Sequence, residues 1–173
     1  GVFASWKINP LPKEYFMWFC LLSTGVFGFF ISIDLFTMFM FYEVALIPMY
    51  LLIGVWGSGN KNYSAMKLTL MLMGGSAFLM LGIIGIYYHS AADGNLTMNI
   101  LEISQNAAIP TNWQYFLFPM TFVGFGVLGA MFPFHTWSPD GHASAPTAVS
   151  MLHAGVLMKL GGYGCFRIAI FLM

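Results

Sequence analysis

Long runs without a charged residue are the feature that most limits what this chain can fold into. The runs Tyr15–Ile33 and Trp113–Phe134 contain no Asp, Glu, Lys or Arg. Runs of this length match the roughly 20 apolar residues that a helix needs to cross a bilayer. Only 7% of the 173 residues are charged and 59% are hydrophobic, whereas soluble domains carry about 25% charged residues. The sequence therefore predicts an integral membrane protein.

The apolar runs predict an all-α polytopic membrane protein, with five transmembrane helices in a single module. Ser32 or Asp34 is placed to cap the second helix. A short helix at the membrane interface is expected within residues 95–105. The expected transmembrane helices cover about residues 15–33, 35–56, 63–88, 113–134 and 145–173, with a broken segment at 135–143.

The broken segment follows from prolines that interrupt apolar sequence. Pro119 lies inside the fourth expected helix and Pro133 lies at its end, so we expect a kink and then a break. Interrupted backbone is tolerated at membrane depth only where protein or cavity water satisfies it, which points to a water-lined path. His135 and His142 then serve either as loop residues or as a proton entry, and Asp140 lies between them.

The lysines predict an orientation in the membrane. When five membrane crossings are counted from the N-terminus, three lysines fall on the same side of the membrane: Lys7, Lys13 and Lys61. The acidic residues of the connections fall on the other side: Asp34, Asp93 and Glu102. By the positive-inside rule, the lysine side faces the cytoplasm.

Two ionisable residues lie inside the expected spans. Glu43 is roughly 12 Å into the second helix at 1.5 Å per residue, and Pro48 leaves the carbonyl of Val44 without its helical donor. Lys159 falls near mid-membrane, among apolar and small residues. Such a charge costs about 2.5–3.5 kcal/mol to insert, and intramembrane ionisable residues commonly mark ion or proton paths. We interpret both as candidate proton carriers, with polar contacts between helices as the alternative.

The surroundings of Lys159 fit proton transfer. Four glycines accompany it: Gly155, Gly161, Gly162 and Gly164. Small residues leave space for another backbone or for water. His153 precedes Lys159 on the same helix and can exchange protons at neutral pH, although a histidine that only contacts a neighbouring helix is equally consistent with this position.

Composition excludes other classes of function. The net charge is zero and there is no basic stripe, so nucleic acid is not an expected partner. Cys20 and Cys165 form no C-x-x-C pair and are expected to be core packing residues. The GFGVLG stretch at residues 124–129 lies inside an apolar run rather than after a strand, so helix packing explains it. Because the chain starts at Gly1 and stops within an apolar run, we expect a piece of a longer polypeptide.

Three motifs carry a resemblance to a known family. They are FYEVALIPMYLLIGVWG at residues 41–57, FPFHTWSPDGHASAPTAVS at 132–150 and HAGVLMKLGGYG at 153–164. They closely resemble the chain M family, the antiporter-like, proton-translocating membrane subunits of respiratory complex I (NADH:quinone oxidoreductase). Members of this family are longer and contain two inverted repeats of five helices, a plan shared with other transporters. The resemblance implies that these residues form the first repeat.

The resemblance implies roles for individual residues. Glu43 matches a glutamate implicated in proton pumping, and Lys159 matches the lysine that links the two half-channels. Lys67 matches a lysine or aromatic position that opens the next helix. The broken-helix motif is matched by Pro133, His135, Trp137, Pro139, Asp140 and His142. With His153, these matches make up the expected proton path.

Leu128 departs from the family pattern. The family has lysine and then proline in a V-K-x-P motif, and counting back from Pro133 puts Leu128 at the lysine position and Ala130 at the proline position. Glu43 therefore lacks its usual cationic partner. Lys67 is a possible substitute, but only through bridging water, because it starts near one membrane face while Glu43 is deep.

Sequence and resemblance together predict proton translocation within complex I, without redox chemistry in this chain. No cofactor or metal is expected here, whereas NADH, FMN, iron–sulfur clusters and quinone are expected in partner subunits. The expected partners are lipids and the other membrane subunits of complex I, including neighbouring antiporter-like subunits, in the inner membrane of a bacterium rather than of a mitochondrion or plastid. Two alternatives stay open: a related subunit of a sodium/proton antiporter complex or membrane-bound hydrogenase, and a passive structural module.

Overall fold

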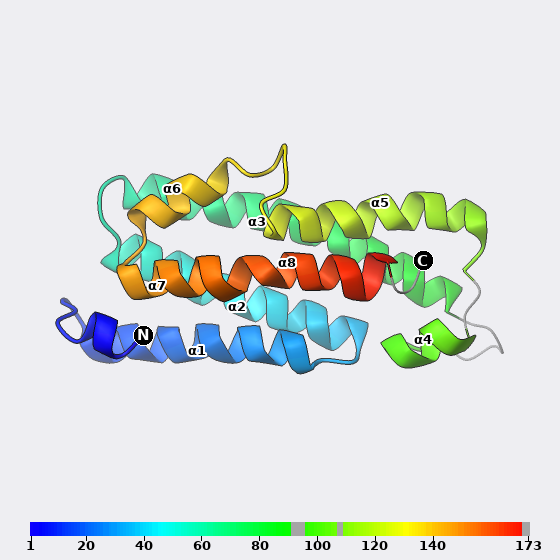
Figure 1. Ribbon diagram of the computed structural model, residues 1–173, viewed down its shortest axis with the longest axis horizontal. Coiled ribbons are helices and arrows are strands. Elements are labelled where there is room, and N and C mark those ends of the chain that lie inside the picture. Colours follow the sequence, from blue (N-terminus) through cyan, green and yellow to red (C-terminus); the bar gives the residue numbers. More distant parts are fainter. Residues whose placement is uncertain (91–95, 107–108, 171–173) are drawn as a thin grey trace.

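The computed structural model describes residues 1–90, 96–106 and 109–170, and the regular secondary structure of these residues is helical (Figure 1). One isolated antiparallel bridge joins Asp34 to Asn99, beside the start of the second long helix. The all-α class expected from the sequence is therefore confirmed.

Three long helices form the first half of the chain: α1 (Pro12–Ile31), α2 (Leu35–Trp56) and α3 (Lys61–His89). Each is long and apolar enough to cross a membrane. The expected second helix has the observed bounds, and the other two differ from expectation by a few residues. Asp34 explains the sharp start of α2, because its carboxylate accepts a hydrogen bond from the Thr37 backbone amide at 3.0 Å.

The second half is more interrupted than expected. The short helix predicted within residues 95–105 is present as α4 (Ile100–Asn106). Next, α5 (Thr111–Leu128) continues through Pro119 and stops well before the expected residue 134. Part of the expected broken segment at 135–143 is itself helical, as α6 (Trp137–Ser144). The break thus lies earlier, at residues 129–136, where Ala130 adopts a left-handed φ of 53° that ends the helix.

The last expected helix, at 145–173, starts at Thr147 and contains two π-helical turns. Its consecutive segments are α7 (Thr147–Leu152), η2 (His153–Leu157), α8 (Met158–Gly164) and η3 (Cys165–Ile170). They follow one another as a continuous rod, which we call the C-terminal rod (Figure 1). A π-helical turn inside an α-helix is uncommon and frequently marks a functional site. Residues 171–173 lie outside the described residues.

The helices pack side by side, α1 on α2, α2 on α3, and α3 on both α5 and α6. The C-terminal rod lies in front of α2 and α3, between α1 and α5 (Figure 1). Residues 1–13, with Lys7 and Lys13, and the α2–α3 turn, with Lys61, are segments at one end of the bundle (Figure 1). The start of α2, which follows Asp34, and α4, which contains Glu102, lie at the other end, so the two sets are separated as predicted. Asp93 lies outside the described residues.

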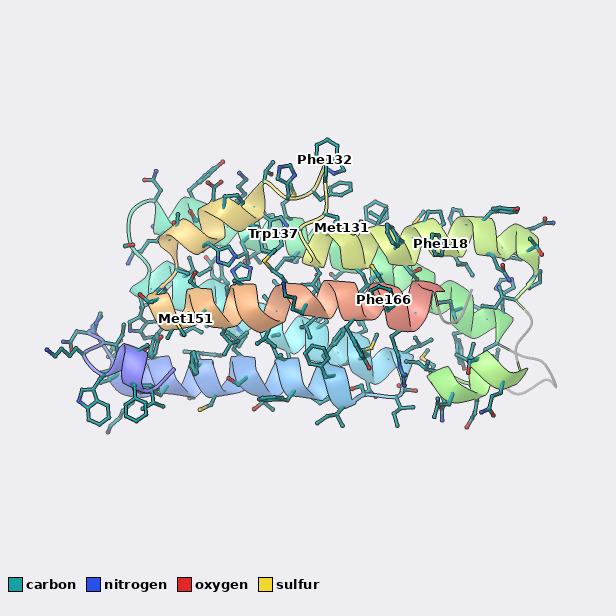
Figure 2. All side chains as sticks on the ribbon, viewed as in Figure 1. Phe118, Met131, Phe132, Trp137, Met151 and Phe166 are labelled. Atoms are coloured by element: carbon teal, nitrogen blue, oxygen red, sulfur yellow. The ribbon has the colours of Figure 1, made fainter. Side chains whose placement is uncertain are left out.

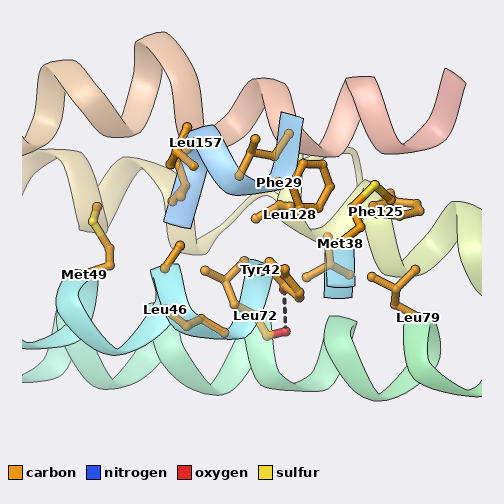
Figure 3. Packing of buried hydrophobic residues seen from close by; sticks show 14 of the residues in the cluster. Phe29, Met38, Tyr42, Leu46, Met49, Leu72, Leu79, Phe125, Leu128 and Leu157 are labelled. Carbon is orange, nitrogen blue, oxygen red and sulfur yellow. Dashed lines mark hydrogen bonds between the residues drawn. The ribbon is translucent and has the colours of Figure 1, made fainter. Parts of the chain in front are cut away.

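The core lies where α2, α3, α5, α1 and the C-terminal rod meet (Figure 3). The Tyr42 hydroxyl donates a hydrogen bond of 2.9 Å to the carbonyl of Leu72, which satisfies a buried polar atom between α2 and α3. The backbones of α3 and α5 approach closely at Gly124, where an added Cβ would lie 2.8 Å from the Leu79 nitrogen. Helix packing therefore accounts for Gly124, the first glycine of the GFGVLG stretch.

The outer faces of the long helices carry large apolar side chains, as expected of a membrane protein. Phe27, Ile31 and Leu70 are each more than half exposed. Cys165 is buried, in agreement with the expected packing role, but Cys20 is exposed on α1. The core assignment of Cys20 is therefore wrong for this chain, because its side chain points to the outer face of the first helix.

Candidate functional site

An ion pair joins α3 to α6 near the lysine end of the bundle. The Lys67 ammonium group lies 2.6 Å from Asp140 Oδ2, and the two side chains are 25% and 42% exposed. The Tyr63 ring is 5.8 Å from the same ammonium group. Lys67 thus pairs with Asp140, and the suggested pairing of Lys67 with Glu43 is not the arrangement observed.

A polar cavity of about 300 Å³ lies beside this ion pair. Its lining comes from the α2–α3 turn, the first turn of α3 and the end of α6: Ser58, Gly59, Asn60, Tyr63, Ser64, Asp140, Ala143 and Ser144. The Ser144 hydroxyl donates to the Ser64 hydroxyl at 2.7 Å in a buried position. Hydroxyls, an amide and a carboxylate line one opening, so the cavity can hold water next to Asp140.

Two histidines meet in the interior between α6 and the C-terminal rod. The rings of His142 and His153 stack with centroids 4.3 Å apart, and the Trp137 ring stacks on His153 at 5.3 Å. His153 is fully buried, and neither of its ring nitrogens has a hydrogen-bond partner among the described residues. His142 is half-buried, and its Nδ1 lies 3.1 Å from the Ser150 hydroxyl. We call His142, His153 and Ser150 the histidine cluster.

The breaks in the helices position this cluster. Near the end of α5, the carbonyl of Val127 accepts two hydrogen bonds, from the Ala130 amide at 3.1 Å and from Trp137 Nε1 at 3.2 Å. The second contact holds the start of α6 against α5, with Trp137 inside and Phe132 on the outside of the connecting turn (Figure 2). His153 is the first residue of η2.

Lys159 lies on a different face of the C-terminal rod from His153. Its side chain is exposed on the surface of the chain, within a stripe that includes Gly155, Gly162 and Phe166. Nothing described lies within 4 Å of a Cβ added to Gly155 or Gly162. Among the described residues, this face of the rod contacts no other helix.

Gly161, on the opposite face of the rod, serves close packing. A Cβ there would lie 2.3 Å from the Gly129 nitrogen. Only some of the predicted glycines therefore leave open space beside Lys159, and others bring α8 against the end of α5. The rod has one packed face and one open face, with the lysine on the open one.

Glu43 also lies on an outward stripe, on α2. Exposed apolar side chains share this face at helical spacing: Phe36, Met40, Ile47 and Tyr50. Glu43 itself is half-buried, and its Oε1 has no hydrogen-bond partner among the described residues. Pro48 is buried inside α2, which continues through it. The structure thus leaves Glu43 apart from the Lys67–Asp140 pair and the histidine cluster.

The two positions that depart from the family pattern differ in what their surroundings allow. Leu128 is 1% exposed and packs in the core (Figure 3). Ala130 has a φ of 53°, whereas proline holds φ near −65°. The local backbone after α5 therefore suits a small residue at position 130 and excludes proline.

The remaining candidates of the broken segment lie on its surface. Pro133 is exposed in the turn between α5 and α6. His135 is exposed there too, with its ring 5.7 Å from that of Phe132. His135 therefore does not join the histidine cluster. Among the described residues, no group of three or more His, Cys, Asp or Glu side chains is arranged to hold a metal ion.

Sequence reasoning missed Ser150 as a member of the cluster. Its spacing contained the signal, because Ser150 precedes His153 by three residues and so falls on the same helical face. Its contact with His142 could not be read from the sequence, since it depends on how α6 folds back on the C-terminal rod.

Comparisons with known proteins agree with this architecture. A family described as "NADH:quinone oxidoreductase/Mrp antiporter, TM" matches residues 32–173. The relative named NADH-quinone oxidoreductase subunit M from Rickettsia prowazekii is 44% identical over 165 residues, which are 94% of this chain and 32% of the relative. The chain thus spans about a third of the length of the curated relatives it matches.

Two solved structures share the fold. A chain of respiratory complex I from Thermus thermophilus with bound NADH has a TM-score of 0.85 and 22% identity, covering 99% of this chain and 36% of its own. A chain of the Mrp complex from Dietzia sp. has a TM-score of 0.74 and 23% identity, covering 90% and 29%. The helices of this chain are therefore arranged in space as in both of these structures.

Proposed function

The chain belongs to the family of NADH:quinone oxidoreductase and Mrp antiporter membrane subunits, and we propose that it forms part of a proton-translocating, antiporter-like subunit of an NADH:quinone oxidoreductase. The single observation that carries this proposal is Lys159, an ammonium group midway along the C-terminal rod, between its two π-helical turns. Family membership supports the type of complex, and the relatives' greater length means that the complete activity belongs to the longer subunit.

In this proposal the chain moves protons and performs no redox step. Water in the polar cavity delivers protons to the Asp140 region at the lysine end, and Lys159 accepts and releases protons in the middle of the membrane. His153 of the histidine cluster precedes Lys159 by six residues on the C-terminal rod. Its imidazoles can act as both donor and acceptor, which suits transfer over short distances. Glu43 contributes through its outward face, toward a neighbouring subunit.

Electron transfer belongs to partner subunits in this proposal. NADH, FMN, iron–sulfur clusters and quinone would bind there, and the released energy would change the charge near Lys159. The subunit would lie in the cytoplasmic membrane of a bacterium, beside other antiporter-like subunits. The bacterial relative named above supports this location.

The decisive experiment replaces Lys159 with Ala in the complete complex, reconstituted in vesicles. We expect NADH-driven acidification to fall to background, because an alanine cannot hold a proton, while assembly on a native gel is preserved. Lys13→Ala is the matched control, since Lys13 is an exposed lysine at the end of the bundle, and it should pump normally. Normal pumping by an assembled Lys159→Ala complex would refute the proposed role.

A second candidate is a subunit of a sodium/proton antiporter complex. The shared fold with the Mrp complex chain and the wording of the family description favour keeping it. Vesicles that hold the complete complex separate the two: an antiporter exchanges sodium for protons without NADH, whereas the proposed subunit acidifies vesicles only with NADH. A passive structural module, suggested by Leu128 at the lysine position, predicts that Lys159→Ala changes neither activity.

A further inference from the structure

The stacked imidazoles of His142 and His153 set a limit on how much charge they carry together. Their ring centroids are 4.3 Å apart with an angle of 27° between the planes. Two unit positive charges at this separation repel strongly in a partly buried setting. The nitrogens lie on the edges of the rings, whereas the two residues face each other with their ring planes. Stacked in this way, the rings cannot hydrogen-bond directly to one another.

His153 needs partners for its nitrogens at those edges. It is 0% exposed, and both nitrogens lack a hydrogen-bond partner among the described residues. Buried polar atoms in native proteins are nearly always hydrogen-bonded to protein or to ordered water. An imidazole nitrogen can donate or accept such a bond according to its proton, so the ring edges of His153 suit bound water.

The charged groups around the pair do not favour two positive charges. On α6, the Asp140 carboxylate is already engaged by Lys67 of α3. On the C-terminal rod, Lys159 adds a positive charge, although its side chain lies on the open face. Trp137 and Ser150, which contact the pair directly, are uncharged. One proton on the pair is therefore favoured over two.

We propose that His142 and His153 form a single proton-carrying unit that holds one proton at a time, with Ser150 as the residue that positions it. In each transfer, an N–H bond of one imidazolium breaks, water at the ring edge relays the proton, and an N–H bond forms on the neutral partner. No net charge is created and no other reactant is needed. The Ser150 hydroxyl, 3.1 Å from His142 Nδ1, keeps the His142 ring in the stack.

This inference rests on the proposed function, and a double-mutant cycle in the complete complex tests it. His142→Gln, His153→Gln and the double variant are compared for protons pumped per NADH. If the two rings carry one shared proton, the double variant should lose no more than the more impaired single variant, because either change breaks the same unit. The proposal would be overturned if the fold-loss of pumping in the double variant equalled the product of the two single fold-losses. Normal pumping by both single variants would overturn it too.

His135→Gln is the matched control. His135 is a histidine of the same segment but is exposed and outside the cluster, so its replacement should leave pumping unchanged. His142→Gln covers the possibility that the buried His153→Gln does not assemble, because His142 is half-buried. In that case His142→Gln alone decides: an assembled variant that pumps normally overturns the inference, and a several-fold loss supports it.

Ser150 is tested by a readout that a purely structural role would not change. Ser150→Ala should shift the pH at which pumping is half-maximal, while Ser150→Thr, which keeps the hydroxyl, should restore it. An assembled Ser150→Ala complex that pumps with the pH profile of the parent protein would contradict the positioning role. Failure of this inference is distinguishable from failure of the proposed function: if Lys159→Ala abolishes pumping while the histidine variants pump normally, only the shared-proton unit is lost.

Discussion

The ammonium group of Lys67 and the carboxylate of Asp140 meet at 2.6 Å and thereby join α3 to α6 across 73 positions of the sequence. This contact links a long membrane helix to a short helix that follows a break in the chain. The short helix carries His142 and lines the polar cavity. The ion pair therefore helps to hold the cavity and the histidine cluster in their relative positions.

Asp140→Asn and Lys67→Gln should each lower the thermal stability of the assembled protein modestly. Both side chains are partly exposed, so solvent screens their attraction and the pair contributes little to stability. The charge-reversed double variant, Lys67→Asp with Asp140→Lys, should recover part of the loss because the attraction is restored. Thermal unfolding in detergent measures all four proteins. A double variant that is less stable than both single variants would show that geometry, not charge, dominates the contact.

Gly161→Ala should disturb the chain far more than Gly162→Ala. The added Cβ at Gly161 would lie 2.3 Å from the backbone nitrogen of Gly129, which cannot move aside, whereas nothing described lies near Gly162. Overpacking of this kind costs about 1–3 kcal/mol. Thermal stability and yield of assembled protein report the difference. Equal effects of the two substitutions would contradict the packing of α8 against α5.

Ala130→Gly should raise stability by about 1 kcal/mol, because an alanine in the left-handed region is strained by roughly this amount and glycine is not. The φ of Ala130 is 53°. Ala143→Gly is the matched control in the exposed part of α6, where loss of the methyl group should instead lower stability by about 0.5–1 kcal/mol. The melting temperature should therefore rise above that of the parent protein in Ala130→Gly and fall below it in Ala143→Gly.

Asp34→Ala should destabilise the start of α2 by about 1 kcal/mol, because the carboxylate caps the Thr37 amide. Asp34→Asn is the control, since an asparagine oxygen can accept the same hydrogen bond. Hydrogen exchange at the first turn of α2 should speed up in the alanine variant alone. Similar exchange in both variants would assign the stability of this turn to the backbone hydrogen bonds that join Ile33 and Leu35 to Ile100 and Met98.

The long helices were predictable because charge-free runs and an N-cap act locally. Asp34 and Trp56 bound α2 where the sequence indicates. The end of α5 was predicted too late, at Pro133, because a proline is visible in the sequence. The helix ends earlier, where Ala130 adopts a left-handed conformation that is unusual for an alanine and carries no sequence signal.

Most members of the candidate site could be predicted from the sequence, with Ser150 as the exception, but their arrangement could not. His142, His153, Lys67 and Asp140 were identified by residue type and motif. Their division into an ion pair and a stacked cluster depends on how α6 folds back against α3 and the C-terminal rod, which is a tertiary property. The outward direction of Lys159 was missed because all residues around it are apolar or small, so neither helical face stood out.

The open face of the C-terminal rod has a consequence for biogenesis. A newly inserted chain would expose Lys159 on one side and the Glu43 stripe on another, and exposed membrane charges of this kind favour recognition by proteases that clear unassembled subunits. The survival of the chain in the cell would then depend on how quickly other transmembrane segments cover both faces. The rate of assembly, more than the rate of folding, would therefore determine how much of the protein accumulates.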